Sequence, residues 1–378
     1  MRFNFYKKLF ILLFKTKLIF KRPNKKKILF FDASHSKLII DKFKMNYKNY
    51  EILNSRFETL NIPILIQTIK KEPFNLSLKN YFLQYISAVK PEKVITLIDN
   101  NITFYQFKKY FPDIEFFSIQ CGHRTKNRDF FLQLKKKDFK KQDLSCDRVF
   151  VANLGFGKKM QKYINCKITP LGFFKNNFIK ISNNKIQKKT ILFISQFREY
   201  QINADSFKKK HFFVEKKILP VIQKYCKDKN FLFYILGCSK NSKLEEKYFQ
   251  SILKPSNFIF KKKLEYPKNY KFIDKFEVVT FIDSTLGYEA ISRKKKVAVF
   301  SKRKLSKKSP IEKFGWPVRY PNKGLFYSNR SFNLEDTYRI LNNVTKISQK
   351  NWNKKILPSM KELAIFNYKN SILKHKIN

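Results

Sequence analysis

A turn near residue 284 combines the residue types that an anion-binding site requires. An apolar run that reads as a buried strand ends there, and residues 283–289 follow as Asp, Ser, Thr, Leu, Gly, Tyr and Glu. If a helix begins at this turn, the hydroxyls of Ser284 and Thr285 lie beside backbone N–H groups that lack an acceptor within the helix and therefore attract phosphate. Glu289, about one turn along, could accept hydrogen bonds from sugar or ribose hydroxyls, and Gly287, which opens the helix, is predicted to belong to the same binding site. The alternative is an ordinary Ser/Thr cap with a structural glycine.

A second polar cluster directly follows the apolar run 190–195. Arg198 can bind a phosphate or carboxylate through two parallel hydrogen bonds, and Ser195 and Gln196 can bond to a ligand. We expect this cluster to share one ligand-binding site with the turn near residue 284. In the alternative interpretation, Arg198 and Glu199 are only a solvated pair on a loop.

The N-terminal half offers candidates for proton transfer or nucleophilic attack. Asp99 ends one hydrophobic run, and His123 and Arg124 end the next. Together they would place a carboxylate, an imidazole and a guanidinium at the ends of adjacent strands, where they could deprotonate an acceptor hydroxyl or attack an anomeric carbon. Glu58, just before a helical stretch, is a further carboxylate. As alternatives, Asp99 and Glu58 are helix caps and His123 is structural.

Alternating apolar strands and helical stretches must position these residues. Such alternation predicts two parallel sheets with right-handed crossovers, and therefore an α/β protein with two Rossmann-like domains that face a central cleft. The predicted domains span residues 27–179 and 190–330, and helices at 331–378 are expected to pack back across both. The predicted strands are 27–32, 50–53, 93–99, 115–120, 148–152, 190–195, 231–236, 277–282 and 296–300, and the main predicted helices are 62–71, 76–89, 212–225, 242–253 and 286–292.

The chain is strongly basic, with 81 Lys and Arg against 28 Asp and Glu and a net charge of +53. Such a charge suggests nucleic acid or an anionic membrane, although the excess of Lys, Asn, Ile and Phe is also what A+T-rich coding DNA produces. The lysines are spread along the whole length and form no concentrated aromatic and basic motif, so a nucleic-acid partner is the less favoured interpretation.

The first 26 residues are predicted to associate with the inner membrane. Their apolar run at residues 9–14 is far shorter than the roughly 20 residues that span a bilayer, and its basic flanks suit a helix lying in the membrane interface. The alternatives are a docked helix or a weak export signal. The sequence has an odd number of cysteines, as in a reducing compartment, and no Asp-x-Asp or other ligand spacing, so we expect no metal site.

These motifs, in this order, resemble the surface-carbohydrate biosynthesis proteins of bacteria. That family is similar to GT-B glycosyltransferases and to the capsule and O-antigen transferases that use CMP-activated Kdo-like acids. The resemblance covers roughly residues 25–330, and Cys121 departs from it, because an asparagine is expected there. The matching stretches are residues 56–62, 98–100, 120–124, 195–198, 283–290 and 314–317.

The resemblance implies a cytoplasmic, peripherally membrane-bound glycosyltransferase without a cofactor. It would move a sugar from a nucleotide-sugar donor, here a CMP donor whose single phosphate needs no metal, to a glycan or lipid-linked acceptor. Ser284, Thr285 and Arg198 would hold the donor phosphate, and Asp99, with Glu58 or His123, would act as acid, base or nucleophile. A CDP-polyol phosphotransferase of the same fold is the nearest alternative, and a basic nucleic-acid-binding protein is a more distant one.

Overall fold

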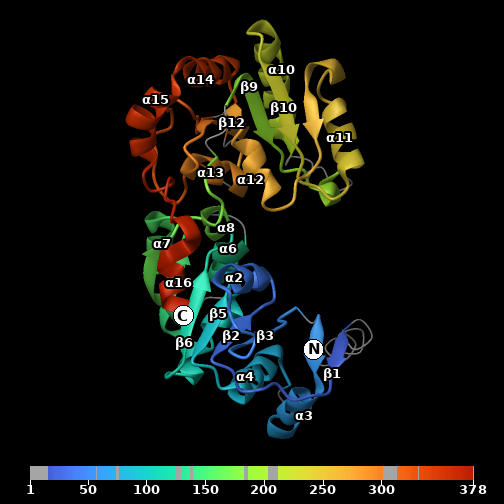
Figure 1. Cartoon of the computed structure of the whole chain (residues 1–378), viewed down its shortest axis with the longest axis vertical. Coiled ribbons are helices and arrows are strands. Elements are labelled where there is room, and N and C mark those ends of the chain that lie inside the picture. The colour runs from blue at the N-terminus through green and yellow to red at the C-terminus, as the bar shows by residue number, and fades with distance from the viewer. Residues whose placement is uncertain are drawn as a thin grey trace.

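Two parallel β-sheets form the framework of the protein in a computed structural model (Figure 1). The structure describes residues 16–56, 58–73, 76–124, 129–136, 139–182, 186–202, 212–300, 313–330 and 332–377.

The first sheet has six strands, and every neighbouring pair is parallel. In spatial order they are β3 (Tyr50–Leu53), β2 (Ile28–Phe31), β5 (Lys93–Thr96), β6 (Glu115–Ile119), β7 (Ser145–Val151) and β8 (Asn165–Pro170). The order of the strands reverses between β2 and β5. Open α/β sheets bind ligands outside the carboxyl ends of their strands at such a reversal.

The second sheet has five parallel strands and a reversal of the same kind. In spatial order they are β11 (Ile259–Lys261), β10 (Leu232–Leu236), β9 (Gln187–Ile194), β12 (Phe276–Phe281) and β13 (Lys296–Val299). Here the reversal falls between β9 and β12. The two polar clusters predicted to hold the donor follow these two strands and therefore lie side by side.

Helices connect the strands and cover the sheets (Figure 1). Those around the first sheet are α2 (Ser36–Phe43), α3 (Ile62–Lys71), α4 (Leu78–Val89), α5 (Ile102–Tyr105), α6 (Asp129–Lys136), α7 (Leu154–Met160) and α8 (Phe174–Asn177). Those that follow are α10 (Phe213–Asp228), α11 (Ser242–Gln250), α12 (Lys268–Ile273), α13 (Thr285–Ser292), α14 (Leu334–Lys346), α15 (Gln349–Asn351) and α16 (Ser371–Ile377). Short 3-10 or π turns occur at Lys108–Tyr110, Lys141–Asp143, Glu199–Gln201, Pro255–Asn257, Trp352–Ile356, Leu357–Met360 and Tyr368–Asn370.

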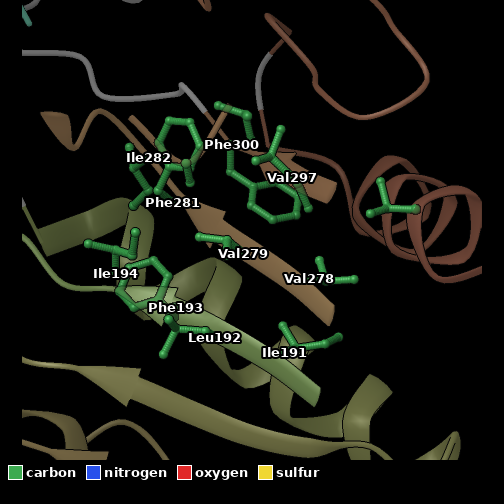
Figure 2. Packing of buried hydrophobic residues seen from close by; sticks show 14 of the residues in the cluster. Ile191, Leu192, Phe193, Ile194, Val278, Val279, Phe281, Ile282, Val297 and Phe300 are labelled. Atoms are coloured by element: carbon green, nitrogen blue, oxygen red, sulfur yellow. The ribbon is translucent and has the colours of Figure 1, made fainter. Parts of the chain in front are cut away.

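Continuous apolar strands bury both faces of each sheet, as parallel sheets require. All four residues of β2 are buried, and so are the last five of β9. In Figure 2, side chains of β9 such as Leu192 and Phe193 lie in one cluster with Val279 of β12 and Val297 of β13. This packing fixes the strand ends from which the polar loops emerge.

The N-terminal segment corrects one prediction. Within residues 1–26, residues 1–15 lie outside the described part of the chain, but Lys17–Ile19 is a strand, β1, that pairs in parallel with β4 (Thr59–Asn61). These residues are therefore not part of an interfacial helix. They form a small two-stranded sheet with β4. A side-chain hydrogen bond also holds this segment in place, because Asn61 donates to the carbonyl of Lys21.

The C-terminal residues cross from the second sheet back to the first, as the sequence predicts. Helix α14 packs against α10 and β13, whereas α16 lies beside the first sheet (Figure 1). Leu373 and Ile377 of α16 are buried in one cluster with Phe30 of β2, and the Lys93 side chain donates to the carbonyls of Lys376 and Ile377. Within the described ranges, no helix is both long and apolar enough to cross a membrane.

Candidate active site

The loop after β6 meets the turn that starts α13, so the two predicted halves of the site are in contact. The backbone N–H of His123 donates to the Thr285 hydroxyl at 3.0 Å. The His123 ring stacks on the ring of Tyr288, with centroids 3.9 Å apart. Gly122 permits this approach, because a Cβ there would lie 3.3 Å from the Thr285 hydroxyl oxygen.

Asp99 binds Arg124 through both carboxylate oxygens. Arg124 Nε lies 2.9 Å from Oδ2 and Nη2 lies 2.5 Å from Oδ1, which also accepts the N–H of Cys121 at 3.1 Å. Asp99 is buried, with 1% of its surface exposed. Because both oxygens are already hydrogen-bonded, this geometry favours Asp99 as the residue that positions Arg124 and the loop after β6, rather than as the predicted base or nucleophile.

His123 is a neutral imidazole at physiological pH. Burial lowers its pKa to about 4, and the Arg124 charge acts in the same direction, against the opposing effect of Asp283. A neutral ring can accept a proton from, or donate one hydrogen bond to, a bound ligand without adding charge.

The start of α13 has the features that a phosphate site needs. Ser284 occupies the N-cap position in an extended conformation, yet its side chain forms no capping hydrogen bond. The first backbone N–H groups of the helix have no acceptor within the helix, and the helix dipole adds partial positive charge there. Ser284 is only 6% exposed, so a ligand that reaches it is largely shielded from water.

Glu289 lies on the buried side of α13 and has an unusual protonation equilibrium. Its carboxylate accepts a hydrogen bond from the Tyr270 hydroxyl at 2.9 Å. Burial raises the pKa of Glu289 to about 7, although the Tyr270 bond and the charges of Lys175 and Arg293 counteract the shift. At neutral pH both protonation states are populated, so Glu289 can donate as well as accept a hydrogen bond.

Gly287, predicted to bind the donor, has a packing role instead. A Cβ at this position would lie 2.2 Å from a ring carbon of Phe281, the last residue of β12. The glycine is therefore required for the close approach of α13 to its own strand. This contact accounts for the residue without any ligand.

Ser195 is likewise structural, whereas Arg198 stays a candidate. The Ser195 hydroxyl donates to Glu245 and accepts the N–H of Phe197, and Glu245 also accepts two backbone N–H groups after β10. This network ties together the loops after β9 and β10. Gln196 is half-buried beside it. Arg198 is exposed, and no side chain in the described part of the protein pairs with its guanidinium.

Glu58 is not brought to the other candidates. It is exposed just before β4, and its backbone carbonyl accepts the N–H of Lys17. No contact between described residues links it to Asp99 or His123. The helix-cap alternative is wrong for Glu58 as well, because Asn61 is the N-cap residue of α3 and Glu58 precedes β4.

Sequence reasoning missed three residues beside the site, Asp32, His35 and Lys175. Asp32, at the end of β2, is 2% exposed and accepts hydrogen bonds from the side chains of Ser55 and Arg56 at 2.7 and 3.0 Å. Burial lowers the pKa of His35 to about 4, with Lys175 and Arg56 acting in the same direction. Burial also lowers the pKa of Lys175, against the effect of Glu289.

Only Asp32 had a signal in the sequence, because it ends an apolar strand. Lys175 follows the last strand of the first sheet in a chain rich in lysine, where one more lysine carries no information. Within the described ranges, no group of three His, Cys, Asp or Glu residues could hold a metal ion. The site thus offers a helix N-terminus, a neutral imidazole, a titrating carboxyl and nearby cations, a set suited to an anionic ligand with hydroxyl groups.

Comparisons with known proteins agree with this fold. A family described as "putative O-antigen biosynthesis protein" matches residues 117–378. No curated protein matches the chain. Among solved structures, the Methanocaldococcus jannaschii UDP-GlcNAc 2-epimerase in complex with UDP-GlcNAc and UDP is 11% identical, with a TM-score of 0.53 over 93% of this chain and 99% of that one.

Two further structures are similar. S. aureus MnaA, solved with UDP, is 14% identical with a TM-score of 0.51 over 93% of this chain and 94% of that one. TarM of S. aureus is 16% identical with a TM-score of 0.46 over 80% of this chain, which spans 58% of the length of TarM. At these identities the epimerase and MnaA comparisons establish a shared fold, and the predicted pair of Rossmann-like domains is confirmed.

Proposed function

Because this chain belongs to the family of O-antigen biosynthesis proteins, we propose that it is a glycosyltransferase that moves a sugar from a nucleotide donor to a cell-surface glycan. The observation that carries the proposal is the start of α13. There the Ser284 side chain makes no capping hydrogen bond, the first N–H groups of the helix have no acceptor within it, and Thr285 contacts the loop after β6 that carries His123 and Arg124. Phosphate binding at such a helix start is a general consequence of the helix dipole and its unpaired donors.

In this proposal, Ser284, Thr285 and Arg198 bind the donor phosphate, and Glu289 contacts a hydroxyl of the sugar or ribose. His123 is the candidate base for the acceptor hydroxyl, since it lies in the loop that meets the donor turn. Asp99 positions Arg124, and the positive charge of Arg124 stabilises the bound anionic ligand. The acceptor is a glycan or a lipid-linked glycan.

We propose a CMP-activated acidic sugar as the donor. A single phosphate can be neutralised by the helix start and by arginine alone, and the reaction then needs no metal to bridge two phosphates. The epimerase and MnaA structures carry UDP or UDP-GlcNAc, so a UDP-sugar is the donor against which CMP must be compared.

Ligand-induced thermal stabilisation tests the donor site. CMP, CDP, UDP and GDP, alone and as sugar conjugates, are added to the wild type and to the Ser284→Ala/Thr285→Val double variant. We expect a CMP compound to raise the wild-type Tm, because a ligand at 100 times its Kd adds about 2.7 kcal/mol to the free energy of unfolding. The double variant should lose most of this shift. Ser251→Ala, an exposed serine at the end of α11, is the matched control. If no nucleotide stabilises the wild type, the donor site is wrong.

Product analysis separates the possible reactions. A glycosyltransferase leaves free CMP and a glycan enlarged by one sugar. A CDP-polyol phosphotransferase also leaves CMP, but only from a CDP-polyol and with the whole polyol phosphate added to the acceptor. Conversion of UDP-GlcNAc to its 2-epimer without a glycan product would contradict the proposal and favour the activity named for the similar solved structures.

We also propose that the protein works at the cytoplasmic face of the inner membrane, held there by its net charge of +53. Binding to vesicles that contain about one-third anionic lipid, weakening with salt, is the expected result. Equal binding to neutral vesicles would contradict it. Oligonucleotide binding with a steep salt dependence would instead support the alternative of a nucleic-acid partner.

A further inference from the structure

A cavity of about 560 Å³ lies at the waist between the two sheets, away from the start of α13. It is lined by the linker residues Lys180 and Ile181, by Ser292 and Lys294 at the far end of α13, and by side chains from residues 357–368. These are the segments that join the two sheets, and they come together in the narrow middle of the molecule (Figure 1). The volume is within the roughly 300–1,000 Å³ typical of small-molecule sites.

The charge around this waist cavity is positive. Lys180 and Lys294 are both exposed, and neither ammonium group has a hydrogen-bond or ion-pair partner in the described parts of the chain. A third cation is close by, since the Lys369 ammonium lies 5.5 Å from the centre of the Tyr368 ring. None of the lining residues is acidic. An anionic group could therefore bind without displacing an existing ion pair.

The rest of the lining is apolar and partly aromatic. Ile181, Leu357 and Ala364 line the cavity together with Phe366 and Tyr368, whose rings are nearly parallel, 17° apart, with centroids separated by 6.3 Å. Flat aromatic faces pack well against the C–H face of a sugar ring. A ligand that suits both parts of the lining has an anionic group and a ring with an apolar face.

We propose that the waist cavity is a second binding site, for a saccharide that carries a carboxylate or phosphate. Lys180 and Lys294 would pair with the anionic group, and the Phe366–Tyr368 pair would contact the sugar ring. The eight residues of α13 separate the cavity from the donor turn, about 12 Å at 1.5 Å per residue. The site is therefore distinct from that of the proposed donor and does not depend on it.

Titration calorimetry on the full-length chain tests the site. The probes are N-acetylglucosamine 1-phosphate and glucuronic acid, with neutral N-acetylglucosamine and inorganic phosphate as comparisons. We expect the two anionic sugars to bind the wild type, and Lys180→Glu/Lys294→Glu to weaken binding at least tenfold. Lys243→Glu, which makes the same change on the exposed side of α11, should leave binding unchanged. Circular dichroism checks that each variant is folded.

The donor-site variant separates this site from the proposed function. Sugar-phosphate binding that persists in Ser284→Ala/Thr285→Val supports the waist cavity even if no nucleotide binds. Binding lost in that variant but kept in Lys180→Glu/Lys294→Glu would overturn the inference, because the probe would then occupy the donor turn. Equal affinity for neutral N-acetylglucosamine or for inorganic phosphate, or no binding of either anionic sugar, would also overturn it.

Discussion

Replacing Arg293 with methionine should destabilise the protein more than any other single loss of charge in the described structure. Arg293 follows α13 and is fully buried. All five N–H donors of its guanidinium are used, since it binds both carboxylate oxygens of Asp274, the Asn176 side chain and the carbonyls of Ile179 and Lys180. The residue therefore joins the second sheet to the linker that arrives from the first.

The magnitude follows from what the substitution leaves behind. Methionine keeps most of the aliphatic volume, so the cavity term is small, but the Asp274 carboxylate, 4% exposed, stays buried without its cation. Removing one partner of a buried ion pair costs about 3–5 kcal/mol. Arg339 provides the control: its pair with Asp336 is 26% and 10% exposed and it also donates to the Gly324 carbonyl, so Arg339→Met should cost less than Arg293→Met.

Urea unfolding followed by circular dichroism measures both free energies. We expect the midpoint of Arg293→Met to fall well below those of the wild type and Arg339→Met. The double variant Arg293→Met/Asp274→Asn should recover part of the loss, because the uncompensated charge is then gone. A cost for Arg293→Met below about 1 kcal/mol, equal to that of the control, would refute the argument that this buried network holds the linker.

Three further predictions concern single positions. Gly287→Ala should cost about 1–3 kcal/mol of unfolding free energy, because its Cβ would overlap the Phe281 ring, whereas Gly122→Ala, with more room, should cost less; equal costs would count against the packing role. Because its pKa is raised, Glu289 contributes stability at acidic pH that is lost as pH rises from about 4.5 to about 7. The free energy of unfolding of the wild type minus that of Glu289→Gln should therefore fall by up to about 3 kcal/mol over that range. A difference that does not change with pH would contradict this. Glu245→Ala should cost at least about 2 kcal/mol in urea unfolding, because buried donors of two loops lose their acceptor, and a neutral effect would show the network to be dispensable.

Alternating apolar runs were sufficient to predict the two sheets and most of their helices. The predicted helix at 62–71 matches α3, and the strands in both sheets lie within a few residues of their predicted positions. The surface-carbohydrate family predicted from the motifs is also confirmed. Strands β1, β4, β8 and β11 were missed because they are short or half-exposed and lack a continuous apolar run.

The candidate site was predictable only in part. The meeting of His123 with Thr285 follows from parallel topology, which collects strand ends at one edge of each sheet. The roles of Ser195 and Gly287 depend instead on single contacts with Glu245 and Phe281, and no spacing in the sequence encodes those contacts.

The return of α16 to the first sheet has a consequence for how the protein is made. Leu373 and Ile377 complete one face of a core whose other members, such as Phe30, leave the ribosome hundreds of residues earlier. Domains generally fold in the order of their synthesis. Here the first sheet can pack one face early but must keep the other open until α16 has been synthesised, so residues far along the chain complete a core that begins with β2.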